Sequence, residues 1–314
     1  YFYRQGFFFV ISAIVAIVIL YVVNLEKMRF ANTYLVYLAI IMLVMVLLKG
    51  TTVKGATRGL RLGPLSVQPS FFARIALVFF FANVLDKKNE LLQATKNILH
   101  FPQNFPELSL LSLLVFGLIF MEKHLSAIII GGITLISLLF YAGIRKRIIL
   151  ILLGVGLIAG MLIITKGDSF RMQRMRTFKK YSLFFKERDL SQSADADYQV
   201  RESLTALTSG GLFGTGISRG RAKHYYLPEA RTDYVYTIIG EEWGYLGAML
   251  VFLLHSMLFF ATLRMANRHE NRYYRFLGVG MALNIYANVL VNTGVAMSIL
   301  PPTGNTLPFI SYGG

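Results

Sequence analysis

The sequence predicts an all-α polytopic membrane protein, a bundle of helices that span a lipid bilayer. Of its 314 residues, 55% are hydrophobic and 15% are charged, against about 25% charged in ordinary soluble domains. The mean hydropathy is +0.56. Apolar runs such as 148–153 do not alternate, which favours helices over the strands of a membrane barrel. This composition excludes a soluble enzyme, and the absence of cysteine excludes disulfides and Cys-ligated metals.

Eight segments are long and apolar enough to be spans, for which roughly 20 residues are needed. In chain order they cover 5–23, 31–49, 69–85, 107–121, 125–143, 148–165, 234–263 and 276–298. Several have Tyr or Phe at their ends, as is common at the membrane interface. No linker or internal repeat separates them, so we expect a single integral-membrane domain over 1–314.

The connecting loops predict the orientation of the bundle. The loops 24–30, 86–106, 144–147 and 264–275 carry twelve Lys and Arg residues, and the short segments on the other side carry six. The positive-inside rule therefore places the first set in the cytoplasm. The long segment 166–233 then forms a large extracytoplasmic loop, too long for the rule to count. The net charge of +16 fits anionic lipid or an anionic substrate.

The sequence pattern of residues 168–188, within this loop, predicts a basic amphipathic helix. Met175, Phe178 and Phe185 recur at helical spacing, and Arg and Lys fill much of the remainder. Such a helix can lie among lipid headgroups and bind them. The alternative is a solvated basic face without a specific ligand.

A glycine-rich stretch follows at 210–223, with the sequence G-G-L-F-G-T-G-I-S-R-G-R-A-K. Backbone N–H groups of such a loop can bind phosphate, although the spacing is not that of a Walker A motif. The alternative is a flexible turn between two helices.

Acidic side chains mark the point where the chain re-enters the membrane. Glu229 and Asp233 flank Arg231. Asp233 could act as a general base or cap the next helix, and spacing alone favours the cap.

Glu241 and Glu242 lie about two turns further on, where charges are usually functional or paired. We expect them to pair with an Arg of a neighbouring helix.

The last predicted span carries a polar stripe. Asn284, Asn288 and Asn292 recur every four residues, which places them on one face of a helix. This pattern is typical of hydrogen bonds between helices in membranes. The alternative is that the stripe lines a cavity.

Four motifs, in this order, together resemble the SEDS family (shape, elongation, division and sporulation) of peptidoglycan glycosyltransferases. They are G-A-T-R-G-L-R-L-G at 55–63 with Q-P-S at 68–70, Y-Q-V-x-x-S-L-x-A-L-x-S-G-G-L-F-G-T-G at 198–216, L-P-E-A-R-T-D-Y-V-Y at 227–236 with G-E-E-W-G at 240–244, and L-P-P-T-G-N-T-L-P-F-I-S-Y-G-G at 300–314. The resemblance implies ten transmembrane helices, of which this chain covers eight, the second to the ninth.

The motifs depart from the family pattern at a few positions. Gly59 stands where the family usually has Trp, and Phe71 replaces a Glu. Arg74 replaces a Lys, and Arg231 replaces a His. The position of the family's essential aspartate is occupied by Asp233.

The resemblance implies polymerisation of lipid II, a disaccharide-pentapeptide on undecaprenyl pyrophosphate, into glycan strands at the outer face of the bacterial cytoplasmic (inner) membrane. A sugar hydroxyl attacks the anomeric carbon of the donor, and lipid pyrophosphate leaves. Asp233 would be the general base. The candidates for binding pyrophosphate and the rest of lipid II are Arg58, Arg61, Arg74, Arg219, Arg221, Lys223, Glu229 and Arg231. A divalent cation, Mg²⁺ or Mn²⁺, could assist, but no cofactor is certain and no ligand set is evident.

The motif around Gly304 leans toward the division branch of the family, whose members act at the septum, with the elongation branch as the near alternative. Either branch implies a class B penicillin-binding protein, a transpeptidase, as partner, beside other division proteins and membrane lipids, and no nucleic acid. Alternatives of another class are a lipid II flippase and a division scaffold. A transporter should show inverted repeats or interrupted helices, and none is convincing here.

Overall fold

The structure is a computed structural model, and it describes residues 2–21, 24, 26–53, 56–62, 65–95, 97–165, 169–182, 195–223 and 227–312. The helices are α1 (Phe2–Tyr21), α2 (Asn32–Lys49), α3 (Pro69–Lys87), α4 (Asn89–Ala94), α5 (Phe101–Asn104), α6 (Pro106–Met121), α7 (Leu125–Tyr141), α8 (Lys146–Thr165), α9 (Ser169–Tyr181), α10 (Asp195–Gly210), α11 (Val235–Arg268) and α12 (Arg272–Ala296), with 3₁₀ turns η1 (Lys27–Ala31) and η2 (Ile98–His100).

The helical fold class is confirmed. Each of the eight predicted spans coincides with a helix, namely α1, α2, α3, α6, α7, α8, α11 and α12. In the part of the chain that the structure describes, α2, α3, α11 and α12 are each long and apolar enough to cross a membrane. A fifth span would join Ile98–Asn104 to Pro106–Met121 across a 97° bend, and Gly6–Tyr21 and Leu125–Tyr141 are apolar but shorter. The protein is therefore a multi-pass membrane protein.

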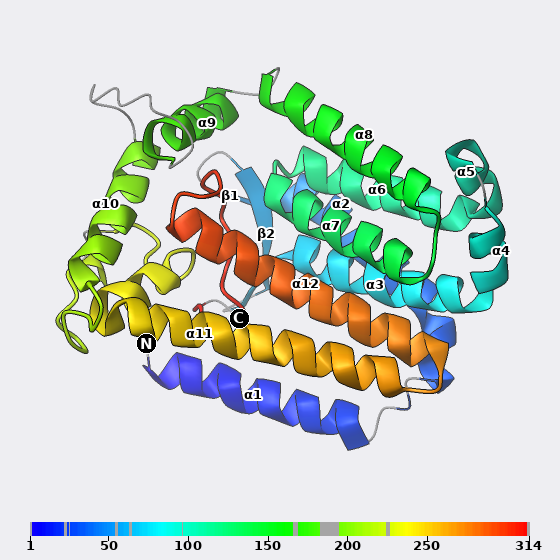
Figure 1. Cartoon of the computed structure of the whole chain (residues 1–314), viewed down its shortest axis with the longest axis horizontal. Coiled ribbons are helices and arrows are strands. Elements are labelled where there is room, and N and C mark those ends of the chain that lie inside the picture. Colours follow the sequence, from blue (N-terminus) through cyan, green and yellow to red (C-terminus); the bar gives the residue numbers. More distant parts are fainter. Residues whose placement is uncertain are drawn as a thin grey trace.

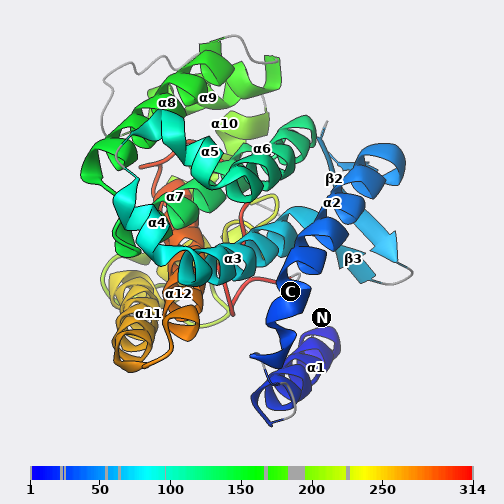
Figure 2. The same cartoon turned by 90° about the vertical axis from the view of Figure 1, so that its right-hand side faces the viewer.

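The core of the bundle is built around α3. Its residues Leu77 and Leu85 are fully buried, together with Leu43 of α2, Leu138 of α7 and Tyr273 of α12. Helix α1 lies apart from α11 and α12 at the edge of the bundle (Figure 2). Apolar side chains that face outward cost nothing in lipid, so the broad exposed apolar surface of these helices fits a membrane environment.

The connections between the helices gather at two ends of the bundle (Figure 1). One end holds η1, α4, α5 and the turns after α7 and α11, and we call it the ion-pair end. Glu26 accepts a hydrogen bond from Asn271 at 3.2 Å, and Arg29 forms an ion pair with Asp86. The four loops that we assigned to one side of the membrane do therefore lie together. The opposite end holds α9, α10 and the C-terminal segment 297–312, and we call it the loop end.

A small sheet at the loop end was not predicted. Strands β1 (Thr51–Val53), β2 (Ala56–Leu62) and β3 (Leu65–Val67) form an antiparallel meander in the order β1-β2-β3. Thr51 pairs with Gly59, and Leu60 pairs with Val67. The Thr and Val residues of β1 favour an extended chain, but β1 and β3 have only three residues each. The seven residues of β2, A-T-R-G-L-R-L, do not alternate regularly between apolar and polar.

Candidate functional site

Helix α9 brings the first side chain to the site. Residues 169–181 of the predicted helix 168–188 are helical, and the rest of the prediction from residue 183 onward, with Phe185, lies outside the described residues. One face of the helix is packed against protein. The hydroxyl of Thr177 is buried and donates to Asp197 of α10. Arg174 donates from Nη1 to the carbonyl oxygen of Pro302 at 3.2 Å. Headgroup binding therefore stays a hypothesis only for exposed cations of this helix such as Arg176.

The glycine-rich loop that follows α10 is bonded to a break in α11. At Gly244 the helix adopts φ +69° and ψ −168°, a conformation that favours glycine. The N–H of Tyr245 donates to the carbonyl of Gly211 at 2.8 Å, and the N–H of Leu246 donates to Leu212 at 3.2 Å. Backbone hydrogen bonds thus join the loop directly to α11.

This pairing requires glycine on both segments. A Cβ atom on Gly210 would lie 2.0 Å from the carbonyl oxygen of Gly240, and one on Gly214 would lie 2.1 Å from that of Glu242. A Cβ atom on Gly244 would lie 2.4 Å from the backbone nitrogen of Gly214. We call the two segments, 210–216 and 240–246, the glycine interlock.

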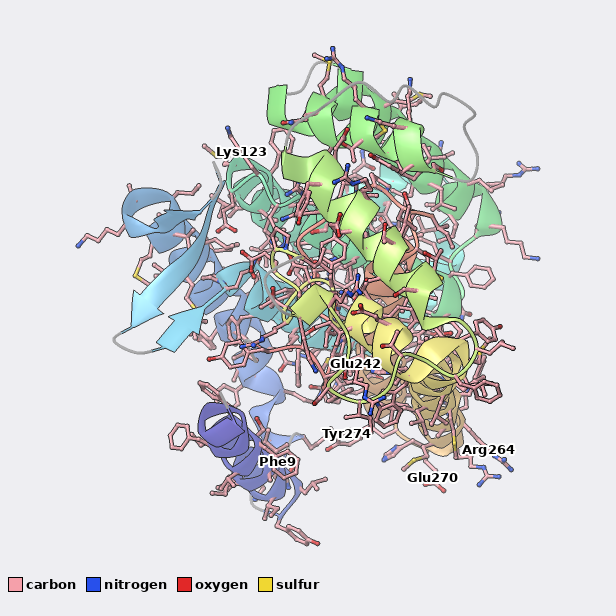
Figure 3. All side chains as sticks on the ribbon, turned by 90° about the vertical axis from the view of Figure 1, so that its left-hand side faces the viewer. Phe9, Lys123, Glu242, Arg264, Glu270 and Tyr274 are labelled. Atoms are coloured by element: carbon pink, nitrogen blue, oxygen red, sulfur yellow. The ribbon has the colours of Figure 1, made fainter. Side chains whose placement is uncertain are left out.

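The acid pair of α11 holds the rest of the loop (Figure 3). Glu241 accepts hydrogen bonds from the backbone N–H groups of Arg221 and Ala222 at 2.7 and 3.0 Å. Glu242 forms an ion pair with Lys223 at 2.5 Å. The expected pairing with an Arg of a neighbouring helix is therefore wrong. The partners lie in the loop itself, because the loop folds back over the start of α11.

The same bonds decide between the two interpretations of the glycine-rich loop. The N–H groups of Thr215 and Gly216 donate to the carbonyls of Glu241 and Glu242 at 2.9 and 3.1 Å. The N–H of Ser218 donates to the carboxylate of Glu242 at 3.2 Å. These groups are not available to a phosphate, and a segment bonded in this way is not a flexible turn. The loop is a structural brace, and its side chains Leu212, Phe213, Arg219 and Arg221 are exposed.

Asp233 lies in the turn before α11. The N-cap residue is Tyr234, and its side chain makes no capping bond, so the capping interpretation of Asp233 is wrong. The backbone carbonyl of Asp233 accepts a hydrogen bond from Asn292 of α12 at 2.8 Å. Asn292 also donates to the carbonyl of Asn305 at 2.6 Å. The bonds of Asn292 therefore cross elements, but they reach a turn and the C-terminal segment. The predicted bond between helices is made by Asn288, which accepts from Arg74 of α3 at 3.2 Å.

The C-terminal segment clamps the same turn. Ser311 donates to the carbonyl of Thr232 at 2.6 Å, and the N–H of Tyr312 donates to that of Arg231 at 3.0 Å. Glu229 adopts φ +54°, and its carbonyl accepts the N–H of Asp233 at 3.1 Å. Main-chain bonds thus fix the position of the aspartate from two sides.

Charge interactions connect Asp233 with α9. Burial lowers the pKa of Arg174, against the raising effect of Tyr234 and Asp233. Burial also raises the pKa of Tyr234, and the nearby negative charge of Asp233 raises it further. Sequence reasoning missed Arg174 as a site residue because it is one of many cations in 168–188. Only its docking on the C-terminal segment distinguishes it.

A cavity of about 620 Å³ lies between α10, the glycine-rich loop and α11. Its wall contains Tyr198, Glu202, Thr205, Ala206, Ser209, Thr215, Arg219, Arg221, Ala222 and Glu241. Of the eight predicted substrate-binding residues, the structure brings Arg219 and Arg221 together here, both exposed. Ala206 and Ala222 also pack in one apolar cluster with Tyr234, so the cavity and the turn of Asp233 share a wall.

The other predicted cations are placed differently. Arg74 is 3% exposed on α3, where Nη2 donates to Asn288 at 3.2 Å and the guanidinium lies 4.9 Å from the ring centre of Phe71. The missing Glu of the family motif is thus replaced by a cation–π contact. Arg58 and Arg61 lie on β2, and their side chains fall outside the described residues.

The described residues contain no ligand set for the possible divalent cation. No group of three or more His, Asp or Glu side chains within the described ranges could hold a metal ion. The residues that the structure describes therefore do not fit a protein-bound Mg²⁺ or Mn²⁺, and we derive no step through such an ion.

Comparison with known proteins gives one consistent result. The family model described as "Cell cycle protein" and labelled for FtsW, RodA and SpoVE matches residues 1–314. The chain is 32% identical to the "Probable peptidoglycan glycosyltransferase FtsW" of Aeromonas salmonicida, covering 99% of this chain and 76% of that protein. It is 30% identical to stage V sporulation protein E of Bacillus subtilis, covering 100% and 84%. One chain from the structural study "Structural coordination of polymerization and crosslinking by a peptidoglycan synthase complex" has the same fold, with a TM-score of 0.77 and 22% identity over 99% of this chain and 83% of that one.

Proposed function

Since the chain belongs to the FtsW/RodA/SpoVE family, we propose that it is a peptidoglycan glycosyltransferase that polymerises lipid II at the outer face of the bacterial inner membrane. The observation that carries the proposal is the placement of Asp233. It stands at the position of the family's essential aspartate, it is not a helix cap, and its main chain is fixed by Asn292. Fixed geometry of this kind is what a general base needs.

In the proposed reaction the carboxylate of Asp233 takes the proton from the acceptor sugar hydroxyl. The hydroxyl oxygen attacks the anomeric carbon of the donor, the bond to the lipid pyrophosphate breaks, and an α-linked donor gives a β-linked product. The positive charge of Arg174 interacts electrostatically with Asp233. The same cation holds α9 against the C-terminal segment through Pro302.

The leaving pyrophosphate requires positive charge outside the hydrocarbon core. Arg219 and Arg221 are the best candidates, because both line the cavity beside the turn of Asp233 and both are exposed. Guanidinium groups match phosphate oxygens in a bidentate manner. Lys223 is a weaker candidate because it is paired with Glu242. Arg231 and Glu229 lie in the turn itself and could contact the sugars.

For the biological setting we propose the division branch, with a class B penicillin-binding protein as partner at the septum. The FtsW relative and the family description "Cell cycle protein" support this branch. An elongation polymerase of the same family is the near alternative. A lipid II flippase or a division scaffold would need no general base, and the placement of Asp233 favours an enzyme over both.

The test is polymerisation of purified lipid II by the purified chain together with its transpeptidase partner. The expected result is glycan chains that a muramidase degrades. If lipid II crosses proteoliposome membranes without being polymerised, the protein is a flippase. If neither activity is found in a complex that is correctly assembled, the enzyme proposal fails.

The proposed orientation has its own test. The chain has no cysteine, so single cysteines can be introduced at Thr208 of α10 and at Arg145 of the ion-pair end, both exposed. We expect an impermeant thiol reagent to label Thr208→Cys on intact spheroplasts and to spare Arg145→Cys until the membrane is opened. The reverse pattern would overturn the topology and the extracytoplasmic site.

A further inference from the structure

The glycine interlock exposes a group of large apolar side chains that the proposed reaction does not use. Phe213 is 80% exposed and Leu212 is 62% exposed at the tip of the loop, and Trp243 is 50% exposed on α11 beside them. Tyr245 is exposed as well. Exposed apolar groups of this size usually mark contact with a membrane or another protein.

The backbone bonds of the interlock fix the depth of this group relative to α11. The N–H of Leu246 donates to Leu212, so the loop tip lies level with that residue. The residues of α11 before Trp243 are buried or half-buried, and an exposed apolar face begins at Trp243 and continues through Leu246, Leu250, Leu253, Leu254 and Met257. Twenty-one positions separate Trp243 from Arg264, about 32 Å of helix, close to the roughly 30 Å of a bilayer core. The loop tip is therefore level with one boundary of the hydrocarbon core.

The side chains around the tip suit that boundary. Trp and Tyr are enriched at membrane interfaces because their rings are apolar and their polar atoms can remain hydrated. Arg219 and Arg221 follow in the same loop and are exposed, at a height where lipid phosphates would lie. Apolar groups next to cations are the usual composition of a segment that enters an anionic lipid surface.

We propose that Leu212 and Phe213 insert into the membrane interface and anchor the glycine-rich loop there, with Trp243 and Tyr245 beside them. The occupant of this surface is lipid of the adjacent leaflet. Two observations favour lipid over a protein partner: the surface continues the exposed apolar face of the membrane-spanning helix α11, and the cations beside it complement headgroup phosphates. The anchor would hold the mouth of the 620 Å³ cavity at the level of the headgroups, which is where a lipid-linked anion enters.

The chain itself offers the probe, because Trp243 is its only tryptophan. In the double variant W243F/F213W the single tryptophan stands at the loop tip. The full chain is reconstituted in liposomes that contain phospholipids brominated at a shallow or at a deep acyl position. We expect strong quenching of tryptophan fluorescence, greater with shallow than with deep bromines. The matched control is W243F/T208W, which places the tryptophan on the exposed face of α10 and should show little quenching.

Two results would overturn the proposal. One is emission typical of water-exposed tryptophan with no quenching in W243F/F213W. The other is a loop tip that is shielded only after the transpeptidase partner is added, which would assign the surface to a protein. If the double variant does not fold, a nitroxide attached to Phe213→Cys gives the same answer, since oxygen should relax it more than a water-soluble nickel complex does. Greater access for the nickel complex would contradict insertion.

Discussion

The two ends of the bundle differ in how their charged side chains are used. At the ion-pair end, opposite charges neutralise each other, as Lys88 and Glu107 do at 2.5 Å. At the loop end, Glu242 also pairs with Lys223, but Glu241 binds backbone N–H groups and Asn292 binds the backbone carbonyl of Asp233. Charges that neutralise each other are not available to a ligand. Bonding through the main chain instead fixes the path of the loop and leaves its arginines exposed, which is what a binding site requires.

The strongest test of this comparison is Asp233→Asn. The variant keeps the carbonyl that accepts from Asn292, so the protein should insert and keep its thermal midpoint. Loss of a general base should lower the polymerisation rate about 10²–10⁴-fold. The measurement is glycan synthesis from purified lipid II. A rate near that of the wild type would remove Asp233 from catalysis, and loss of folding would make it structural.

The second test removes one acid from each end. Glu241→Ala leaves the N–H groups of Arg221 and Ala222 without a partner, at a cost of about 1–3 kcal/mol for each buried group. Glu107→Ala removes an ion pair with side chains 32–38% exposed, worth about 1 kcal/mol or less. We expect a clearly lower thermal midpoint for the first variant only. Equal shifts would show that the two ends are not held differently.

The third test concerns the exposed cations of the loop end. A charge-assisted contact is typically worth about 1.5–3 kcal/mol, so Arg221→Gln should lower both lipid II binding and polymerisation by roughly ten- to a hundredfold. Arg176→Gln on α9 is the matched control. Both are assayed in detergent without anionic lipid, where nonspecific attraction is absent. Small and equal losses would indicate that Arg221 attracts lipid only nonspecifically.

The smallest effect is expected from Arg174→Met. The variant loses the hydrogen bond to the carbonyl of Pro302 and the electrostatic interaction with Asp233. We expect a few-fold lower rate of glycan synthesis from purified lipid II. Arg176→Met on the exposed face of α9 is the matched control and should leave the rate unchanged. Equal losses in the two variants would show that Arg174 has no particular role beside Asp233.

The spans could be predicted because lipid forces each backbone to satisfy its hydrogen bonds within one segment. A helix that spans the membrane is therefore visible in the sequence as a run of roughly 20 mostly apolar residues, and all eight segments have such a run. Strands β1 and β3 are too short for such a pattern, and the residues of β2 do not alternate regularly between apolar and polar. The acid Asp233 was found through resemblance, since spacing alone favoured a cap that the structure assigns to Tyr234.

What could not be predicted depends on contacts between distant segments. The glycines at 210–216 and 240–244 are visible in the sequence, but nothing local shows that the two groups pair with each other. Nothing in the sequence distinguishes Arg174 from the neighbouring cations. Only the folded structure shows that it bonds to Pro302. In the same way, the position of Glu241 and Glu242 within a span predicts pairing with an Arg, because nothing in the local sequence shows that the loop folds back over them.

The sequence distances of these bonds set an order of assembly during synthesis. Thr215 bonds to Glu241 26 positions away, and Arg221 bonds to the same residue 20 positions away, so the glycine interlock can close as soon as α11 has entered the membrane. The bond between Asn271 and Glu26 joins residues 245 positions apart, and the clamp on Asp233 needs Asn292, 59 positions further along. A growing chain that has not yet inserted α12 therefore has its loop braced but its aspartate unfixed, and the geometry that we propose for catalysis is completed only when that helix is in place.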